Sequence, residues 1–151
     1  MVRLNFPDYT FRFRTVSGKK QIFDTQRKKF VSLTPEEWVR QNFLMYLTQD
    51  KNYPSTLVSV ETGMKLYKKL KRTDILIFDR KGNPVAIVEC KAPNVQIDKS
   101  VFDQIVRYNI HFNVKFLMVT NGLQHFCCQL DYQNNSYAFL PEIPDYNYIL
   151  T

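Results

Sequence analysis

The N-terminal part of the chain has the hydrophobic spacing of a β-hairpin. Residues 10–16 alternate phenylalanine with arginine, so every second side chain can face a core, as in a strand. Ser17-Gly18-Lys19 is typical of a turn, and it leads into a partner strand through Gln21-Ile22-Phe23. Residues 26–29 are polar and basic and predict a loop.

A helix is predicted next, because its start carries several signals. In Thr34-Pro35-Glu36-Glu37, threonine can cap the helix, proline suits its first position, and an acidic residue follows three positions after the cap. Tyr53-Pro54 predicts its end. The expected apolar face consists of Val39, Phe43 and Leu47.

The central part of the chain predicts strands that are buried on both faces. A short strand is expected at residues 57–61, before a basic segment at residues 65–72. Residues 73–78 and 85–90 are dense apolar runs separated by Arg80-Lys81-Gly82-Asn83, which predicts a hairpin inside the core.

The C-terminal part predicts a helix followed by strands. Residues 100–112 have helical spacing, with Ser100 and Asp103 as the expected cap, and residues 115–120 form a further buried strand closed by Asn121-Gly122. A last hairpin is expected at residues 126–132 and 136–140. No repeat or linker interrupts this order, so we expect one α/β domain over residues 1–151.

The central hairpin brings charged residues together at one end. If Asp79 faces Pro84 across the turn, the same register places Asp74 opposite Glu89. Directly opposed residues have Cβ atoms roughly 4.5–5.5 Å apart, so the two carboxylates would converge. Lys91 lies two residues beyond Glu89 and therefore on the same face of the strand.

This arrangement suits phosphodiester hydrolysis. Two close carboxylates repel unless a cation lies between them or one of them is protonated. Hard oxygen ligands favour Mg²⁺ or Mn²⁺. Such an ion can stabilise a phosphate under attack and activate a water molecule, while Lys91 orients that water or neutralises the developing charge. The alternative is that Glu89 and Lys91 form a simple ion pair at a strand end.

Charge and cysteine usage narrow the classes of partner. The net charge is +7, and residues 1–75 hold 15 Lys/Arg against 7 Asp/Glu, whereas residues 76–151 hold 6 against 7. A basic half indicates a polyanion such as nucleic acid, or simply a solvated basic surface. No apolar run reaches the roughly 18 residues that span a bilayer, and the three cysteines have no zinc-site spacing, so we expect a cytoplasmic protein.

Several motifs together resemble one nuclease family. Asp74 followed by Ile87-Val88-Glu89-Cys90-Lys91-Ala92-Pro93 resembles the PD-(D/E)xK nuclease superfamily. The chain is most similar to the N-terminal nuclease domain of type I restriction enzyme R subunits, over about residues 10–130. The other matching stretches are Leu33-Thr34-Pro35-Glu36-Glu37-Trp38-Val39-Arg40-Gln41, Arg72-Thr73-Asp74-Ile75-Leu76, Gln104-Ile105-Val106-Arg107-Tyr108-Asn109 and Val119-Thr120-Asn121-Gly122.

The resemblance implies a fold and a set of residue roles. The fold would be a restriction-endonuclease-like mixed sheet flanked by helices, here with an extra N-terminal hairpin. Asp74 and Glu89 would be metal ligands and Lys91 the catalytic lysine. Many members add a first-helix glutamate, for which Glu36 and Glu37 are both candidates.

Two more positions follow from the family pattern. Gln104 and Tyr108 match a Gln-x-x-x-Tyr motif whose residues lie beside the active site and position DNA or the lysine. The alternative is that Tyr108 packs while Gln104 is solvated. A basic run directly before Asp74 is predicted to bind nucleic acid, namely Lys68, Lys69, Lys71 and Arg72.

Two functions from different classes remain. The first is a metal-dependent DNA endonuclease that uses Mg²⁺ or Mn²⁺. The second is a non-catalytic nucleic-acid-binding or assembly module that works with a separate helicase or methylation subunit. The chain has no Walker A pattern, so ATP-driven restriction is not expected of this chain alone. No base-reading element is evident either, so no sequence specificity is predicted.

Overall fold

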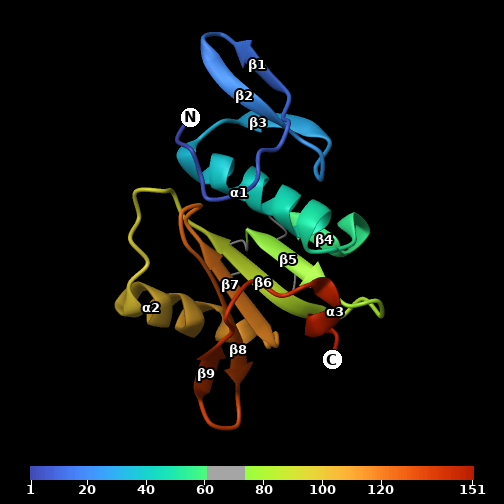
Figure 1. The fold of residues 1–151 in the computed structure, drawn as a ribbon, viewed down its shortest axis with the longest axis vertical. Helices are drawn as coiled ribbons and strands as arrows, with labels where there is room; N and C mark the ends of the chain where they lie inside the picture. The colour runs from blue at the N-terminus through green and yellow to red at the C-terminus, as the bar shows by residue number, and fades with distance from the viewer. Residues whose placement is uncertain (61–73) are drawn as a thin grey trace.

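The computed structural model of the protein describes residues 1–60 and 74–151. Within these residues the strands form two sheets, a three-stranded one in the order β1-β2-β3 and a six-stranded one in the order β4-β5-β6-β7-β8-β9 (Figure 1). The strands are β1 (Phe13–Val16), β2 (Lys19–Asp24), β3 (Lys29–Ser32), β4 (Val58–Val60), β5 (Ile75–Phe78), β6 (Pro84–Cys90), β7 (Phe116–Thr120), β8 (His125–Asp131) and β9 (Ser136–Phe139).

The larger sheet is mixed and has helices on both faces. Its strand pairs are antiparallel except β6 and β7, which run parallel. A parallel pair needs a long crossover connection, and here that connection carries α2 (Lys99–Asn109) with the 3₁₀ turn Ile110–Phe112. The helix α1 (Pro35–Met45) covers the opposite face (Figure 1). This confirms the expected α/β fold, a mixed sheet flanked by helices.

The core has two parts, one on each face of this sheet. Ile75, Ile77 and Val88 belong to the part beneath α1, whereas Leu76 and Ile87 belong to the part beneath α2. Successive strand residues point to opposite faces, so a strand covered on both sides needs apolar residues at every position. That requirement explains the continuous apolar runs of the central hairpin.

The predicted start of α1 is confirmed. The hydroxyl of Thr34 accepts a hydrogen bond from the backbone N–H of Glu37 at 3.0 Å, and Pro35 is the first helical residue. Val39, Phe43 and Leu47 are fully buried, as their spacing predicted. The helix continues as one turn of π-helix over Tyr46–Asp50.

The register of the central hairpin is confirmed at its inner end and wrong at its turn. Ile75 pairs with Val88, as expected, but Phe78 rather than Asp79 pairs with Pro84. Asp79 belongs to the turn instead, where its backbone N–H donates to the carbonyl of Asn83 at 2.8 Å and its carboxylate accepts hydrogen bonds from backbone N–H groups. Val85 becomes the extra residue of a β-bulge.

The N-terminal hairpin is present, and a third strand joins it. β1 and β2 pair around Ser17 and Gly18, which both have positive φ values of 51° and 76°. Residues 26–29 were predicted as a loop, yet Lys29 begins β3, which pairs with β2. The loop itself is shorter, and Lys28 within it has a φ of 55°.

The cap of α2 differs from the prediction. Asp98, and not Ser100 with Asp103, is the N-cap, because its carboxylate accepts a hydrogen bond from the N–H of Val101 at 2.9 Å. Asp103 instead forms an ion pair with Lys99 at 3.0 Å. The helix thus starts one residue earlier than residue 100.

This cap gives a stability prediction with an internal control. Asp98→Ala should lower the free energy of unfolding by about 1 kcal/mol, because it leaves a helix N–H unsatisfied. Ser100→Ala should change it by less than about 0.5 kcal/mol, as for most exposed positions. Urea unfolding of both variants measures the two values, and equal losses would contradict the assignment of the cap.

The remaining elements complete the sheet and one face of the core. Gly122 closes the β7–β8 turn with a φ of 86°, and a Cβ there would lie 2.7 Å from the side chain of Leu4. The C-terminal helix α3 (Tyr146–Ile149) adds Tyr146 and Ile149 to the core beneath α1. Among residues 1–60 and 74–151, no helix is long and apolar enough to cross a membrane.

Candidate active site

The strand β6 carries Glu89 and Lys91 to the edge of the core. Glu89 pairs with Val119 of the parallel strand β7 and lies two residues after Ile87, on the face that α2 covers. The backbone N–H of Lys91 donates to the carbonyl of Thr120 at 2.8 Å, which holds the chain beside β7 beyond the last pair. The backbone under both side chains is therefore fixed against β7.

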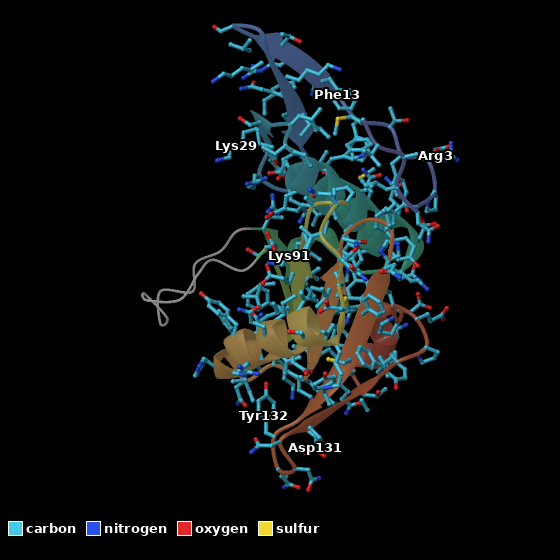
Figure 2. All side chains as sticks on the ribbon, turned by 90° about the vertical axis from the view of Figure 1, so that its left-hand side faces the viewer. Arg3, Phe13, Lys29, Lys91, Asp131 and Tyr132 are labelled. Carbon is cyan, nitrogen blue, oxygen red and sulfur yellow. The ribbon has the colours of Figure 1, made fainter. Side chains whose placement is uncertain are left out.

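A small cavity joins these two residues to α2. Its volume is about 180 Å³, and it is lined by Glu89, Lys91, Val101, Gln104, Ile105 and Tyr108. Gln104 and Tyr108 are four residues apart on the helix and so share one face. In Figure 2, Lys91 lies between α1 and α2. The structure thus brings together four of the predicted site residues around one cavity.

Asp74 is held at the same strand end by the backbone of β6 and by α1. It directly precedes β5, so continuing the ladder from Ile75 places it opposite Glu89. One carboxylate oxygen accepts a hydrogen bond from the N–H of Cys90 at 2.7 Å, and the other accepts one from Arg40 at 2.5 Å. The residue is 7% exposed.

The pKa of the buried Cys90 thiol is shifted, and charged residues of this site contribute to the shift. Burial is the largest cause that raises the pKa of Cys90 well above its ordinary value. The negative charges of Asp74, Glu89 and Glu36 raise it further, against the opposing charge of Arg40. The carboxylates of Asp74 and Glu89 thus both act on the residue between Glu89 and Lys91.

The first helix contributes two different glutamates. Glu37 is buried, and its carboxylate accepts hydrogen bonds from Arg27 at 3.0 Å, from Arg40 at 2.8 Å and from Gln41 at 3.0 Å. Glu36 has a side chain that is 48% exposed, and it accepts one bond from Arg40 at 3.2 Å. Capping of the helix uses only the backbone N–H of Glu37, so its carboxylate is left to these three partners.

The acidic residues of this site offer oxygen donors of the kind that a divalent ion requires. Among the described residues, no group of three or more His, Cys, Asp or Glu side chains is placed to hold a metal. Mg²⁺ is commonly held by one or two carboxylates, with water and substrate phosphates completing its octahedron. The carboxylates of Asp74 and Glu89 are donors of the type that such an ion takes, and both oxygens of Asp74 here accept hydrogen bonds from Arg40 and Cys90. Two carboxylates do not make the closed four-ligand set of structural zinc.

An ion-pair network beside this site was not predicted. Asp24 is fully buried and pairs with Arg27, Arg27 pairs with Glu37, and Arg40 joins Glu37 to Asp74. One signal was present in the sequence, since Arg40 is three residues after Glu37 and next to the buried Val39. The network connects the N-terminal sheet through α1 to the candidate site.

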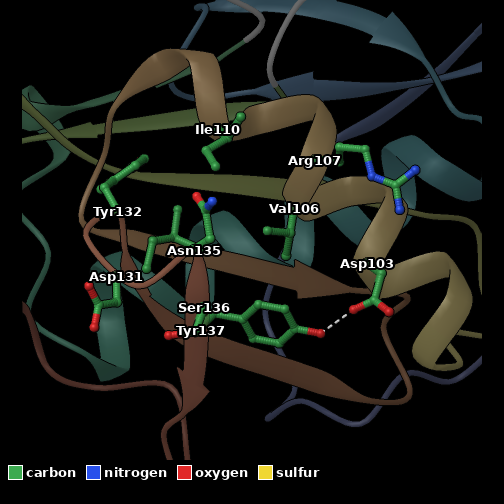
Figure 3. A pocket seen from close by; sticks show the side chains of 10 residues that line it. Asp103, Val106, Arg107, Ile110, Asp131, Tyr132, Asn135, Ser136 and Tyr137 are labelled. Carbon is green, nitrogen blue, oxygen red and sulfur yellow. Dashed lines mark hydrogen bonds between the residues drawn. The ribbon is translucent and has the colours of Figure 1, made fainter.

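A second hollow lies on the other side of α2. It has a volume of about 310 Å³ between α2 and the β8–β9 hairpin, and Asp103, Arg107 and Tyr137 are among its lining residues (Figure 3). The hydroxyl of Tyr137 donates to Asp103, which raises the pKa of Tyr137 to about 12. It shares no residue with the cavity of Glu89 and Lys91.

The predicted nucleic-acid contacts fall in two places. Tyr108 lines the cavity and is 39% exposed. The basic residues Lys68, Lys69, Lys71 and Arg72 lie outside the described residues.

Comparisons with known proteins place the chain in a family. Its fold is similar to the solved structure of a fragment from Vibrio vulnificus YJ016, described as an HsdR subunit of a type I restriction enzyme, with a TM-score of 0.53 and 21% identity. The match covers 78% of this chain and 25% of that chain, so the protein spans about a quarter of that relative. No curated protein matches the sequence. The family model for the N terminus of type I restriction enzyme R proteins matches residues 35–144, more than two thirds of the chain, and the protein therefore belongs to that family.

Proposed function

We propose that the protein is a metal-dependent DNA endonuclease of the PD-(D/E)xK type. The observation that carries this proposal is that Glu89, Lys91, Gln104 and Tyr108 line one shared cavity, at the strand end where Asp74 is also held. Membership of a restriction-subunit family supports it. We propose further that the protein acts in the cytoplasm, beside its DNA substrate.

Each predicted site residue at this strand end has a proposed role. Asp74 and Glu89 would hold Mg²⁺ or Mn²⁺, which when bound would supply positive charge at the phosphate and favour activation of a water molecule. Lys91 would place its ammonium near the scissile phosphate and stabilise charge that develops there. Gln104 and Tyr108 would position DNA or Lys91 from the facing helix.

Of the two first-helix glutamates, Glu36 is the better candidate for the metal site. Glu37 already accepts hydrogen bonds from two arginines and one glutamine, so its carboxylate would have to exchange partners to bind an ion. Glu36 is half exposed. We therefore expect Glu36→Gln to weaken metal binding, measured by calorimetry, more than Glu37→Gln.

The second candidate is a nucleic-acid-binding or assembly module without catalysis. The observation that favours it is the ion pair between Arg40 and Asp74, at 2.5 Å, which places a guanidinium on a carboxylate that the nuclease needs for metal. Such a module would work with a helicase or methylation subunit of a restriction system. The two candidates differ in whether the purified chain cuts DNA.

Metal binding and cleavage together test the proposal. Wild-type protein incubated with plasmid and linear DNA should cut in Mg²⁺ or Mn²⁺ and not in EDTA. Calorimetry should detect Mn²⁺ binding that is lost in Asp74→Asn and in Glu89→Gln, which keep the side-chain shape and remove the charge. Asp131→Asn, which removes an exposed carboxylate from the β8–β9 turn, is the matched control and should bind Mn²⁺ like the wild type. Equal binding by all four proteins would remove this site from consideration.

A further inference from the structure

The N-terminal sheet concentrates positive charge on the protein. Residues 10–32 contain seven Lys or Arg and one acidic residue, a net charge of +6. The single acidic residue, Asp24, is fully buried and paired with Arg27. The charge that this sheet shows to solvent is therefore positive.

One face of the N-terminal sheet packs against α1, and the other faces outward. Ile22 is fully buried and pairs with Phe13 and Val31, and Phe13 contacts Trp38 of α1 at 6.3 Å between ring centroids. These residues form the inward face. Arg14 pairs with Gln21, one residue further along each strand, so both belong to the outward face.

On the outward face, arginines lie on phenylalanine rings. The guanidinium of Arg12 is 4.7 Å from the ring centre of Phe23, and that of Arg14 is 4.2 Å from the ring centre of Phe30. The two rings contact each other at 5.1 Å. Arg14 also donates a hydrogen bond to Gln21 at 2.6 Å. The guanidiniums are thus ordered before any partner binds, which lowers the entropic cost of binding.

A hollow leads from this sheet to the candidate site. It has a volume of about 700 Å³ and extends from Lys29, Phe30 and Ser32 of β3 past the first turn of α1 to Ala92, directly after Lys91. Its carboxylates, Glu36 and Glu37, are paired with arginines. In Figure 2, Lys29 lies on the same side of the molecule as Lys91, whereas Arg3 lies on the other side.

We propose that the outward face of the N-terminal sheet binds the phosphate backbone of duplex DNA and guides it to the candidate site. This basic face is defined by Arg12, Arg14 and Lys19, above Phe23 and Phe30. The inference rests on the proposed function, because DNA is the substrate there. Backbone phosphates match a surface of ordered guanidiniums, which favour phosphate geometry.

The chemistry of the face favours a duplex over a single strand. Proteins that bind single strands stack bases on open aromatic rings. Here Arg12 and Arg14 lie over the rings of Phe23 and Phe30, so the surface offers charge rather than a stacking platform. Contacts to phosphates fix position and carry no base information, so binding should not depend on sequence.

The test is the salt dependence of binding to a short labelled DNA duplex in EDTA. Fluorescence anisotropy measures the binding. Replacing Arg12 and Arg14 together with glutamine should weaken binding and make the plot of log affinity against log salt shallower by about 2, roughly 1 for each lost phosphate contact. The control replaces Arg3 and Lys81 with glutamine, which removes the same charge from exposed positions outside the sheet. The control slope should stay within about 0.5 of wild type.

A charge-preserving variant separates charge from folding of the sheet. Arg12→Lys with Arg14→Lys should keep the wild-type slope, because each lysine can still displace a counterion. An unchanged slope in the glutamine variant, or an equal loss in the lysine variant, would overturn the proposal. So would tighter binding of a single strand than of a duplex, if that binding also depended on Arg12 and Arg14.

The outcome is separate from that of the proposed nuclease activity. Binding is measured without divalent metal. If the protein binds DNA through the basic face but does not cut in Mg²⁺, the proposed nuclease function is contradicted and the proposed DNA-binding face is supported. If the protein cuts in Mg²⁺ but the salt dependence of binding is the same with and without Arg12 and Arg14, the nuclease function is supported and the proposed DNA-binding face is contradicted.

Discussion

Lys91→Ala should lower the rate of DNA cleavage by roughly 10²-fold or more, while DNA and Mn²⁺ bind nearly as in the wild type. An ammonium that acts on developing charge contributes to the transition state and little to the ground state. Lys91 is suited to this because its backbone is fixed to Thr120 and its side chain lines the cavity of Glu89. Cleavage rates under single-turnover conditions, with anisotropy and calorimetry on the same protein, measure the three quantities.

The conservative variant decides between catalysis and a structural ion pair. Lys91→Arg keeps the charge but changes its shape and hydrogen-bond geometry, so a catalytic lysine should not tolerate it. If Lys91 only pairs with Glu89, Lys91→Arg should cut at the wild-type rate, and Lys91→Ala should mainly lower the melting temperature. Lys81→Ala, in the exposed turn between β5 and β6, serves as the control for loss of one positive charge.

Local signals explain which parts of the fold were predictable. The start of α1 depends on four adjacent residues, Thr34 to Glu37, and both the cap and the proline position are confirmed. The pairing of Ile75 with Val88 followed from two apolar runs of similar length around one turn. The bulge at Val85 did not follow, because it depends on how the Asp79 carboxylate accepts hydrogen bonds within the turn.

The third N-terminal strand, β3, was not predictable from local signals. β3 has only four residues, Lys29–Ser32, and its Phe30 and Val31 are adjacent rather than alternating with polar residues. It becomes a strand through pairing with β2, where Phe30 faces Phe23 and Val31 faces Ile22. Strand preference of this kind comes from cross-strand packing and is absent from the local sequence.

The part of the candidate site that depends on strand register and helix period was predictable from the sequence. Glu89, Lys91, Gln104 and Tyr108 meet around one cavity because β6 and α2 have periods of two and 3.6 residues. The contact between Arg40 and Asp74 joins residues that are 34 positions apart. No helix or strand period links such positions. The ion pair between Arg40 and the predicted metal ligand Asp74 was therefore not predictable from the sequence.

Arg40 is a buried cation that pairs with buried carboxylates, and this pairing affects the stability of the fold. Burial alone lowers the pKa of Arg40, but the hydrogen bond and charge of Asp74, with help from Cys90 and Glu37, raise it above its ordinary value. The residue is 5% exposed and stays charged in the folded protein. It compensates the carboxylates of Asp74 and Glu37, whose side chains are 9% and 7% exposed.

Arg40→Met should lower the free energy of unfolding by about 3–5 kcal/mol, the usual result when one partner of a buried ion pair is removed. Methionine fills much of the same space, so the loss comes mainly from carboxylates left without their cation. For a domain of this size, the melting temperature should fall by roughly 10 °C. Arg107→Met, on an exposed position of α2, is the control and should change stability by less than about 0.5 kcal/mol.

Magnesium should restore part of the stability that Arg40→Met removes. If Asp74 is a metal ligand, an ion there supplies the positive charge that the guanidinium provided, so Mg²⁺ should raise the melting temperature of Arg40→Met more than that of the wild type. Adding Asp74→Asn to Arg40→Met should recover stability in EDTA, since no uncompensated charge remains at Asp74, and should abolish the extra effect of Mg²⁺. Equal Mg²⁺ shifts in wild type and Arg40→Met would mean that Arg40 and the ion do not share this carboxylate. An Arg40→Met variant as stable as the wild type would mean that the ion pair makes no net contribution to the folded protein.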